Sequence, residues 1–167
     1  LAAHGRRLLA QGCTGLAIFG TTSETQMFSV AQRQRALEAL LAAGLDPALV
    51  SLGVGCCARD DTVALTRHGL ALGVRRVLML PPFFYKNNPD EGLYRAFAEA
   101  IDGAADPRLE VLLYHFPQVS GVPVTPGVIE RLRASHGQTV RGIKDSSGDR
   151  DHTLGLVQRF PGFEVYA

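Results

Sequence analysis

Short apolar runs alternate with longer amphipathic segments along the whole chain. The apolar runs are continuous, as is typical of strands buried on both faces of a parallel sheet. They predict strands at residues 16–19, 49–54, 74–80, 109–114 and 138–143, and a last strand that begins near Phe163. The segments between them predict helices at residues 1–11, 29–43, 59–72, 90–104, 125–135 and 150–160. This alternation indicates an α/β protein built on a parallel sheet.

The predicted strands recur at the spacing of a βα unit, about 30 residues. The chain begins with a helix and ends inside a strand, and a self-contained open sheet rarely has such ends. We therefore expect residues 1–167 to form a single domain that is part of a (β/α)8 TIM barrel, a partial barrel lacking the first and last units.

The composition is that of an ordinary globular domain, with 46% hydrophobic and 20% charged residues. A formal net charge of +1 gives no support for nucleic-acid binding. No segment approaches the roughly 18 apolar residues of a membrane span, and no signal-peptide layout opens the chain. We therefore expect a cytoplasmic protein without a membrane partner. Cys13, Cys56 and Cys57 are too few for a disulfide framework and are expected to be small buried side chains.

Two reactive side chains stand at the ends of neighbouring predicted strands. Tyr114 ends one apolar run and Lys144 follows the next, so both should lie at the carboxyl edge of the sheet, where barrels carry their active sites. Lysine is a candidate for imine formation with a carbonyl substrate, and the phenol for the proton transfers that an imine requires. Strand alternation predicts that Lys144 shares a face with Val140 and Gly142, with room beside it at the glycine. The alternative is a lysine that reaches solvent from a strand end and a tyrosine in the core.

Two further segments follow predicted strands. Phe19–Glu24 offers two threonine hydroxyls and the backbone N–H groups of a glycine turn, which either hold a small carboxylate or cap the next helix. Leu80–Lys86 is rich in proline and aromatic residues. It either walls a pocket, forms a subunit contact, or simply packs under a loop.

Other patterns exclude cofactor sites. Gly53–Ala58 matches the dinucleotide fingerprint G-x-G-x-x-G/A, but the next strand ends in two prolines where that site needs an acidic residue, so we expect no nucleotide cofactor. The five histidines show no metal-ligand spacing, and there is no Cys/His cluster, so we expect no metal. His115 should face away from Tyr114 and serve packing.

Four motifs follow one another along the chain: Gly20-Thr21-Thr22-x-Glu24, Pro81-Pro82-x-x-Tyr85 with Glu91-Gly92-Leu93-Tyr94, Leu113-Tyr114-x-x-Pro117-x-x-Ser120-Gly121, and Gly142-Ile143-Lys144-Asp145-Ser146-Ser147-Gly148. Together they resemble the dihydrodipicolinate synthase / N-acetylneuraminate lyase family of class I, pyruvate-handling lyases and aldolases. The resemblance covers nearly the whole chain in the family's order and approximate spacing. It implies a (β/α)8 barrel in which the six predicted strands are the second to the seventh.

The resemblance also implies roles for individual residues. Lys144 would form a Schiff base with a 2-oxo acid, usually pyruvate, and Tyr114 would relay protons to and from the imine and an incoming aldehyde. Thr21 would link this phenol to the hydroxyl of Tyr85, which in the family comes from a neighbouring subunit. Neither a metal nor an organic cofactor is implied, and a homo-oligomer is expected, commonly a tetramer.

The remaining implied site residues lie in the first motif, where Thr22 and the backbone at Gly20 would grip the carboxylate. Ser23 replaces the family's usual glycine in this turn without removing a proposed group. Val119 stands where dihydrodipicolinate synthases carry an arginine that binds the second substrate's carboxylate. This difference favours a lyase or aldolase acting on a sugar-derived or other aldehyde. The alternatives within the family are 4-hydroxy-tetrahydrodipicolinate synthase and a dehydratase of a deoxy-oxo sugar acid. From a different class, an inactive fragment or a 2-oxo acid binding module also fits, because a partial barrel leaves its sheet edges exposed.

Overall fold

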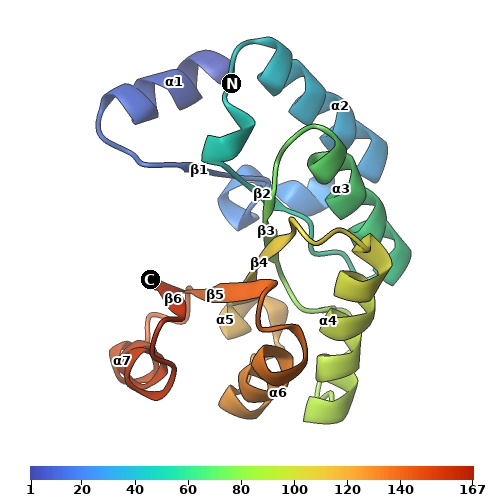
Figure 1. Cartoon of the computed structure of the whole chain (residues 1–167), viewed down its shortest axis with the longest axis vertical. Helices are drawn as coiled ribbons and strands as arrows, with labels where there is room; N and C mark the ends of the chain where they lie inside the picture. The colour runs from blue at the N-terminus through green and yellow to red at the C-terminus, as the bar shows by residue number, and fades with distance from the viewer.

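The computed structural model describes residues 1–167 and contains one six-stranded sheet. All the strands are parallel and each pairs with its neighbours in the chain, so the order in the sheet is the order in the sequence. The strands are β1 (Leu16–Ile18), β2 (Val50–Gly53), β3 (Arg76–Met79), β4 (Glu110–His115), β5 (Val140–Asp145) and β6 (Glu164–Tyr166). The sheet curls from β1 to β6 (Figure 1), and this architecture confirms the predicted partial (β/α)8 barrel.

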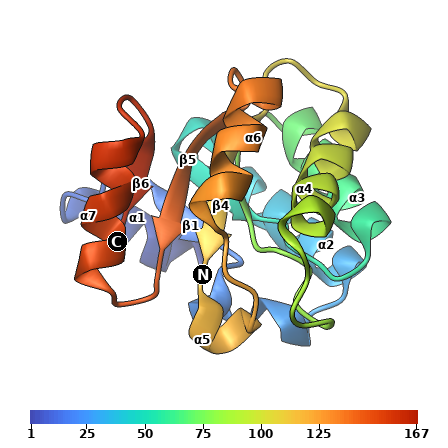
Figure 2. The same ribbon diagram turned by 90° about the horizontal axis from the view of Figure 1, so that it is seen from below.

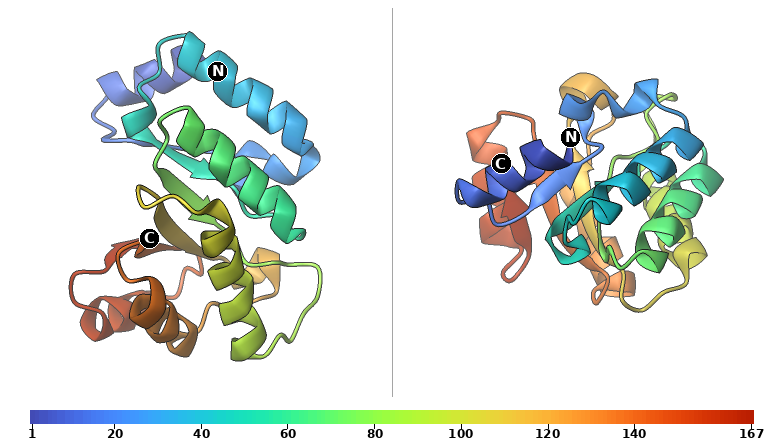
Figure 3. Two further views of the ribbon diagram at one scale, coloured as in Figure 1. Left: turned by 45° about the vertical axis from the view of Figure 1, so that its right-hand side comes forward. Right: turned by 90° about the horizontal axis from the view of Figure 1, so that it is seen from above.

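Helices connect the strands on the outside of the curl. The α-helices are α1 (Ala2–Ala10), α2 (Val30–Ala42), α3 (Arg59–Ala71), α4 (Asp90–Ala104), α5 (Pro117–Ser120), α6 (Pro126–His136) and α7 (Arg150–Arg159). Helices α2, α3, α4 and α6 lie side by side in that order (Figures 2 and 3). No helix has both the length and the apolar character that a membrane crossing requires.

Four short elements within loops were not predicted: the 3-10 helices η1 (Thr21–Ser23), η2 (Thr25–Met27) and η3 (Pro47–Leu49), and the single turn α5. The predicted start of the second long helix is confirmed at Ser29. Its hydroxyl accepts the backbone N–H of Gln32, and the Gln32 side chain accepts the backbone N–H of Ser29. This reciprocal capping box satisfies two of the N–H groups that a helix start leaves unpaired.

The main core lies between the sheet and the helices. It contains 32 buried residues, and its strand members, such as Val77, Leu113 and Ile143, point outward from the curl. The alternate strand positions point inward, where Leu78, Leu112 and Tyr114 form a second, small apolar cluster. Tyr114 therefore belongs to the inner face of the partial barrel.

Two predictions about the face that carries Lys144 are wrong. The β4–β5 register shifts between Val111 and Leu112, so Val140 lies opposite Val111 in the outer core, whereas Gly142 lies opposite Leu112. Gly142 also leaves no room beside the lysine. A Cβ there would sit 2.3 Å from the carbonyl oxygen of Glu164, because β6 packs directly against the glycine backbone.

The prediction of three buried cysteines is also wrong. Cys13 and Cys57 are exposed and Cys56 is only partly buried. All three lie in connections that follow a helix or a strand and not within these elements, so the packing of the core does not enclose them.

Candidate active site

The structure brings Lys144 and Tyr114 together as predicted. They are register partners on β5 and β4, and the Lys144 ammonium Nζ donates a hydrogen bond of 3.2 Å to the Tyr114 hydroxyl. The same nitrogen lies 4.3 Å from the centre of the phenol ring. Tyr114 is only 5% exposed, whereas Lys144 is partly exposed, so the amine is accessible from the inner side of the sheet.

Thr21 continues this contact into a chain of three polar groups. Its hydroxyl and that of Tyr114 share a hydrogen bond of 3.3 Å. Thr21 opens η1, which is separated from the end of β1 only by Phe19 and Gly20. No side chain caps η1, and Ser29 caps the following long helix, so the helix-cap interpretation of the threonine pair is wrong.

The position of Thr21 depends on a close backbone contact. Phe19 adopts a φ of 56°, in the left-handed region, and its carbonyl oxygen packs on Gly53 at the end of β2. A Cβ at Gly53 would lie 2.0 Å from that oxygen. The glycines that match a dinucleotide fingerprint thus serve close packing, since a Cβ at Gly55 would likewise meet the backbone of Leu80 at 2.6 Å.

The surroundings of Tyr114 favour its ionisation. Burial alone would raise the pKa of this phenol, but hydrogen bonds with Thr21, Lys144 and Ser146 and the charge of Lys144 outweigh it. The net result is a pKa below the usual 10.0 of tyrosine. A phenol with a lowered pKa is a better proton carrier at neutral pH.

Ser146 is a site residue that the sequence analysis missed. Its hydroxyl accepts a hydrogen bond of 2.5 Å from Lys144 Nζ, so the amine is held between a phenol and an alcohol. The signal was a hydroxyl two positions after the lysine, in the turn that leaves β5.

The other predicted residues do not join this cluster within the chain. Tyr85 is 75% exposed, and its neighbour Phe84 is 71% exposed and packs edge-on against it. The interpretation of these two aromatics as packing under a loop is therefore wrong. Thr22 is exposed and Gly20 partly buried. They lie beside Thr21 at the first turn of η1, where leading N–H groups lack intrahelical partners.

A cavity of about 840 Å³ lies on the inner side of the curled sheet. Most of its lining comes from the starts of the strands and the loops before them, including Arg76 and Glu110, and Lys144 borders it at the other side. Arg76 bridges Glu110 at 2.9 Å and Glu164 at 3.0 Å. This cavity therefore extends from Lys144 towards the amino ends of the strands, away from Tyr114 and Thr21.

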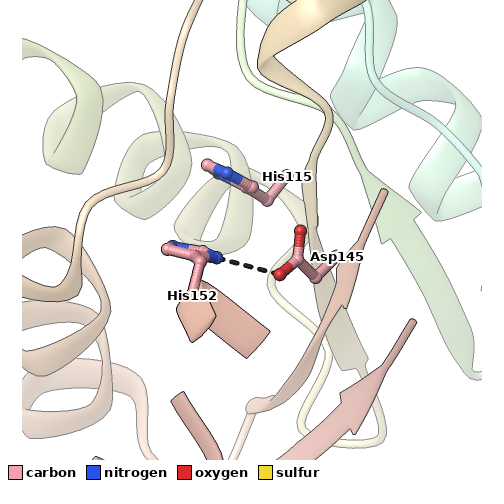
Figure 4. A group of neighbouring side chains, drawn as sticks. All are labelled: His115, Asp145 and His152. Carbon is pink, nitrogen blue, oxygen red and sulfur yellow. Dashed lines mark hydrogen bonds and ion pairs between the residues drawn. The ribbon is translucent and has the colours of Figure 1, made fainter. Parts of the chain in front are cut away.

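A second polar cluster lies behind the lysine and consists of His115, Asp145 and His152 (Figure 4). Their potential ligand atoms lie within 4.8 Å of one another. The hydrogen bonds oppose a metal site. The Val124 N–H donates to His115 Nδ1, so the proton of this neutral ring is on Nε2 and no lone pair is left for an ion. Burial lowers the pKa of His115 and keeps it in this neutral form, and the nearby His152 acts in the same direction.

A curled parallel sheet with a hydrogen-bonded lysine and phenol at its carboxyl edge defines part of a (β/α)8-barrel protein with a polar site at the usual end of the barrel. The dihydrodipicolinate synthetase family pattern matches residues 4–167. The chain belongs to that family.

Relatives and solved structures agree with this assignment. An uncharacterised DapA-like lyase of Chloroflexus aurantiacus is 42% identical over 96% of this chain and 53% of its own length. A 4-hydroxy-tetrahydrodipicolinate synthase of Thermus thermophilus is 34% identical over 87% of this chain and 48% of its own length. The crystal structure of dihydrodipicolinate synthase from Agrobacterium tumefaciens superimposes with a TM-score of 0.94 at 32% identity, over 98% of this chain and 57% of that one.

The fold is shared more widely. The sialic acid aldolase of Ruminococcus gnavus has a TM-score of 0.88 at 23% identity, over 99% of this chain and 54% of that one. The chain spans about half the length of the curated relatives it matches.

Proposed function

We propose that the chain carries the reacting groups of a class I lyase or aldolase that forms a Schiff base between Lys144 and pyruvate or a related 2-oxo acid. The observation that carries the proposal is the hydrogen-bonded series from Lys144 Nζ through the Tyr114 hydroxyl to Thr21. An amine beside a phenol of lowered pKa combines a nucleophile with a proton carrier.

The reaction follows from these groups. After the Lys144 ammonium has lost a proton, its free amine attacks the C2 carbonyl of the 2-oxo acid, and loss of water, with proton transfer through Tyr114, gives the imine. Loss of a proton from the methyl group gives an enamine, whose carbon attacks an aldehyde carbonyl while Tyr114 protonates the new alkoxide. Hydrolysis of the imine releases the product and restores the amine, and the reverse sequence cleaves the same C–C bond.

The remaining site residues complete the proposal. Thr22 and the backbone at Gly20 bind the carboxylate of the 2-oxo acid, next to Thr21. Tyr85 donates to the Thr21 hydroxyl of a second copy of the chain, and its 75% exposure in one chain supports this role. A homo-oligomer, with a tetramer as the expected form, would then be needed for full activity. The six strands correspond to the second to seventh of the family barrel.

Val119 bears on the second substrate. It is 56% exposed on α5, after Tyr114, and offers no charge for a carboxylate. We therefore favour a sugar-derived or other uncharged aldehyde. Relatives named 4-hydroxy-tetrahydrodipicolinate synthase support the second candidate, condensation of pyruvate with aspartate semialdehyde.

Product analysis separates these two candidates. The protein is incubated with pyruvate and either aspartate semialdehyde or a panel of uncharged aldehydes, and condensation products are quantified by mass spectrometry. We expect products with the uncharged aldehydes. A clear preference for the semialdehyde would contradict the role given to Val119, and the variant Val119→Arg tests whether a charge there creates that preference.

A further inference from the structure

The side chain of His152 contacts both residues that lie directly behind the site. His115 and Asp145 follow Tyr114 and Lys144 in their strands and point to the opposite face of the sheet. His152, in the first turn of α7, stacks on the His115 ring with centres 4.5 Å apart and planes at 20°. Its Nδ1 lies 2.8 Å from Asp145 Oδ2 (Figure 4).

Asp145 is a fixed anchor for this contact. Its side chain is fully buried, yet it accepts hydrogen bonds from the Ser147 N–H at 2.9 Å and the Thr153 hydroxyl at 2.7 Å as well as from His152. Burial alone would raise the pKa of this carboxyl, but these hydrogen bonds outweigh it and hold the pKa well below its usual value. An ionised carboxylate only accepts, so His152 Nδ1 carries the proton and donates it.

His115, on the neighbouring strand β4, is also held by hydrogen bonds. Its Nδ1 accepts the Val124 N–H at 3.0 Å, and its backbone carbonyl accepts the Ser146 N–H at 2.8 Å. The ring that His152 stacks on therefore cannot turn without breaking a buried hydrogen bond. His152 thus lies between two groups that are each held by further hydrogen bonds, one from each strand end.

The candidate site lies on the other side of the sheet from His115 and Asp145, and it depends on the short distance between the Lys144 amine and the Tyr114 hydroxyl. The Lys144 side chain has four rotatable bonds, and its 3.2 Å contact with Tyr114 requires the two strand ends to stay in register. The register shifts between Val111 and Leu112, and only the four pairs from Leu112–Gly142 to His115–Asp145 hold the strand ends in register beyond that shift. Ser146, which also binds the amine, lies in the turn that Asp145 closes through Ser147.

We infer that His152 is a positioning residue, which reinforces the pairing of the β4 and β5 ends from behind and thereby helps to hold the Lys144–Tyr114 separation. The inference rests on the proposed function for its catalytic meaning, but the separation itself can be measured without substrate. A displacement of about 1 Å at a reacting group can lower a rate up to about a hundredfold. Loss of the His152 contacts with His115 and Asp145 should therefore slow imine formation about tenfold or more.

Three substitutions separate the effect of the His152 ring stacking from the effect of its hydrogen bond. His152→Ala removes both the stacking and the hydrogen bond. His152→Asn keeps a donor where Nδ1 lies and loses the ring, and His152→Phe keeps the ring and loses the donor. His136→Ala is the matched control, because His136 also pairs with a carboxylate, Asp102 at 3.1 Å, but on the outer surface.

Two readouts are made on each folded variant. The first is the rate constant for reductive trapping of pyruvate, measured against pH and pyruvate concentration. We expect His152→Ala to slow trapping about tenfold at saturating pyruvate with a shifted pH profile, His152→Asn to recover part of the rate, and His136→Ala to match the unaltered protein. An unchanged rate in His152→Ala, or loss of trapping when the unaltered protein is treated with a chelator, would overturn the inference.

The second readout is the tyrosinate absorbance titration of Tyr114 without substrate. Loosening its contact with Lys144 should raise the Tyr114 pKa in His152→Ala and not in His136→Ala. If the unaltered protein traps no pyruvate, the proposed function fails, and this titration alone decides the positioning role. An unchanged Tyr114 pKa in folded His152→Ala would overturn it.

Discussion

Gly53→Ala tests the packing that holds Thr21 against Tyr114. The new Cβ would lie 2.0 Å from the Phe19 carbonyl oxygen and 2.6 Å from its carbonyl carbon, so the backbone of Phe19 must move. Overpacking of this kind costs about 1–3 kcal/mol and more where backbone is the obstacle. Loss of the Thr21–Tyr114 hydrogen bond adds about 1 kcal/mol. The lower chain entropy of alanine in the unfolded state offsets about 0.5–1 kcal/mol.

The net expectation is a free energy of unfolding lower by about 3 kcal/mol and a Tm lower by roughly 6–12 °C. Urea and thermal unfolding followed by circular dichroism measure both quantities. Gly155→Ala is the matched control, because Gly155 lies within α7 with no atom within 4 Å of the new Cβ. It should raise stability by about 0.5–1 kcal/mol. Equal shifts in the two variants, or a Gly53→Ala change below about 0.5 kcal/mol, would refute the packing argument.

Two further predictions concern titration. Thr21→Val removes a hydrogen bond that lowers the Tyr114 pKa, so tyrosinate absorbance, compared with Tyr114→Phe, should show this phenol ionising at higher pH; an unchanged titration would count against the Thr21 contact. Burial lowers the pKa of folded His115 below its usual 6.5, so the unfolded chain takes up protons first as the pH falls. The stabilisation from neutral His115 is complete above about pH 6.5 and is lost as the pH falls through the folded pKa. Unfolding of His115→Asn, which can still accept the Val124 N–H, should depend less on pH between 7 and about 5, and an identical pH dependence would contradict this assignment.

The sequence predicts the fold well because each βα unit carries its own signal. Continuous apolar runs separated by amphipathic helices identify a parallel sheet, and the carboxyl ends of such strands meet at one edge. That geometry is sufficient to bring Tyr114 and Lys144 together from two strands that are neighbours in sequence.

Features that depend on irregular or distant contacts escape the same reasoning. The register shift between β4 and β5 does not change the spacing of the apolar residues, so strand alternation places Val140 on the wrong face. The contact of His152 with His115 and Asp145 joins two strand ends and a helix. The spacing of these three residues in the sequence does not match any metal-ligand motif, so it gives no indication that they meet. A partner's contribution, as expected for Tyr85, cannot be read from one chain.

The central claim is that Lys144 is the nucleophile, and reductive trapping tests it most directly. The protein is incubated with pyruvate and borohydride, digested, and mapped by mass spectrometry, with Lys144→Ala and Lys86→Ala as controls. We predict one reduced pyruvate on the peptide that contains Lys144, retained in Lys86→Ala and absent from Lys144→Ala. A folded chain that gives no adduct, or an adduct on another lysine, would contradict the Schiff-base account.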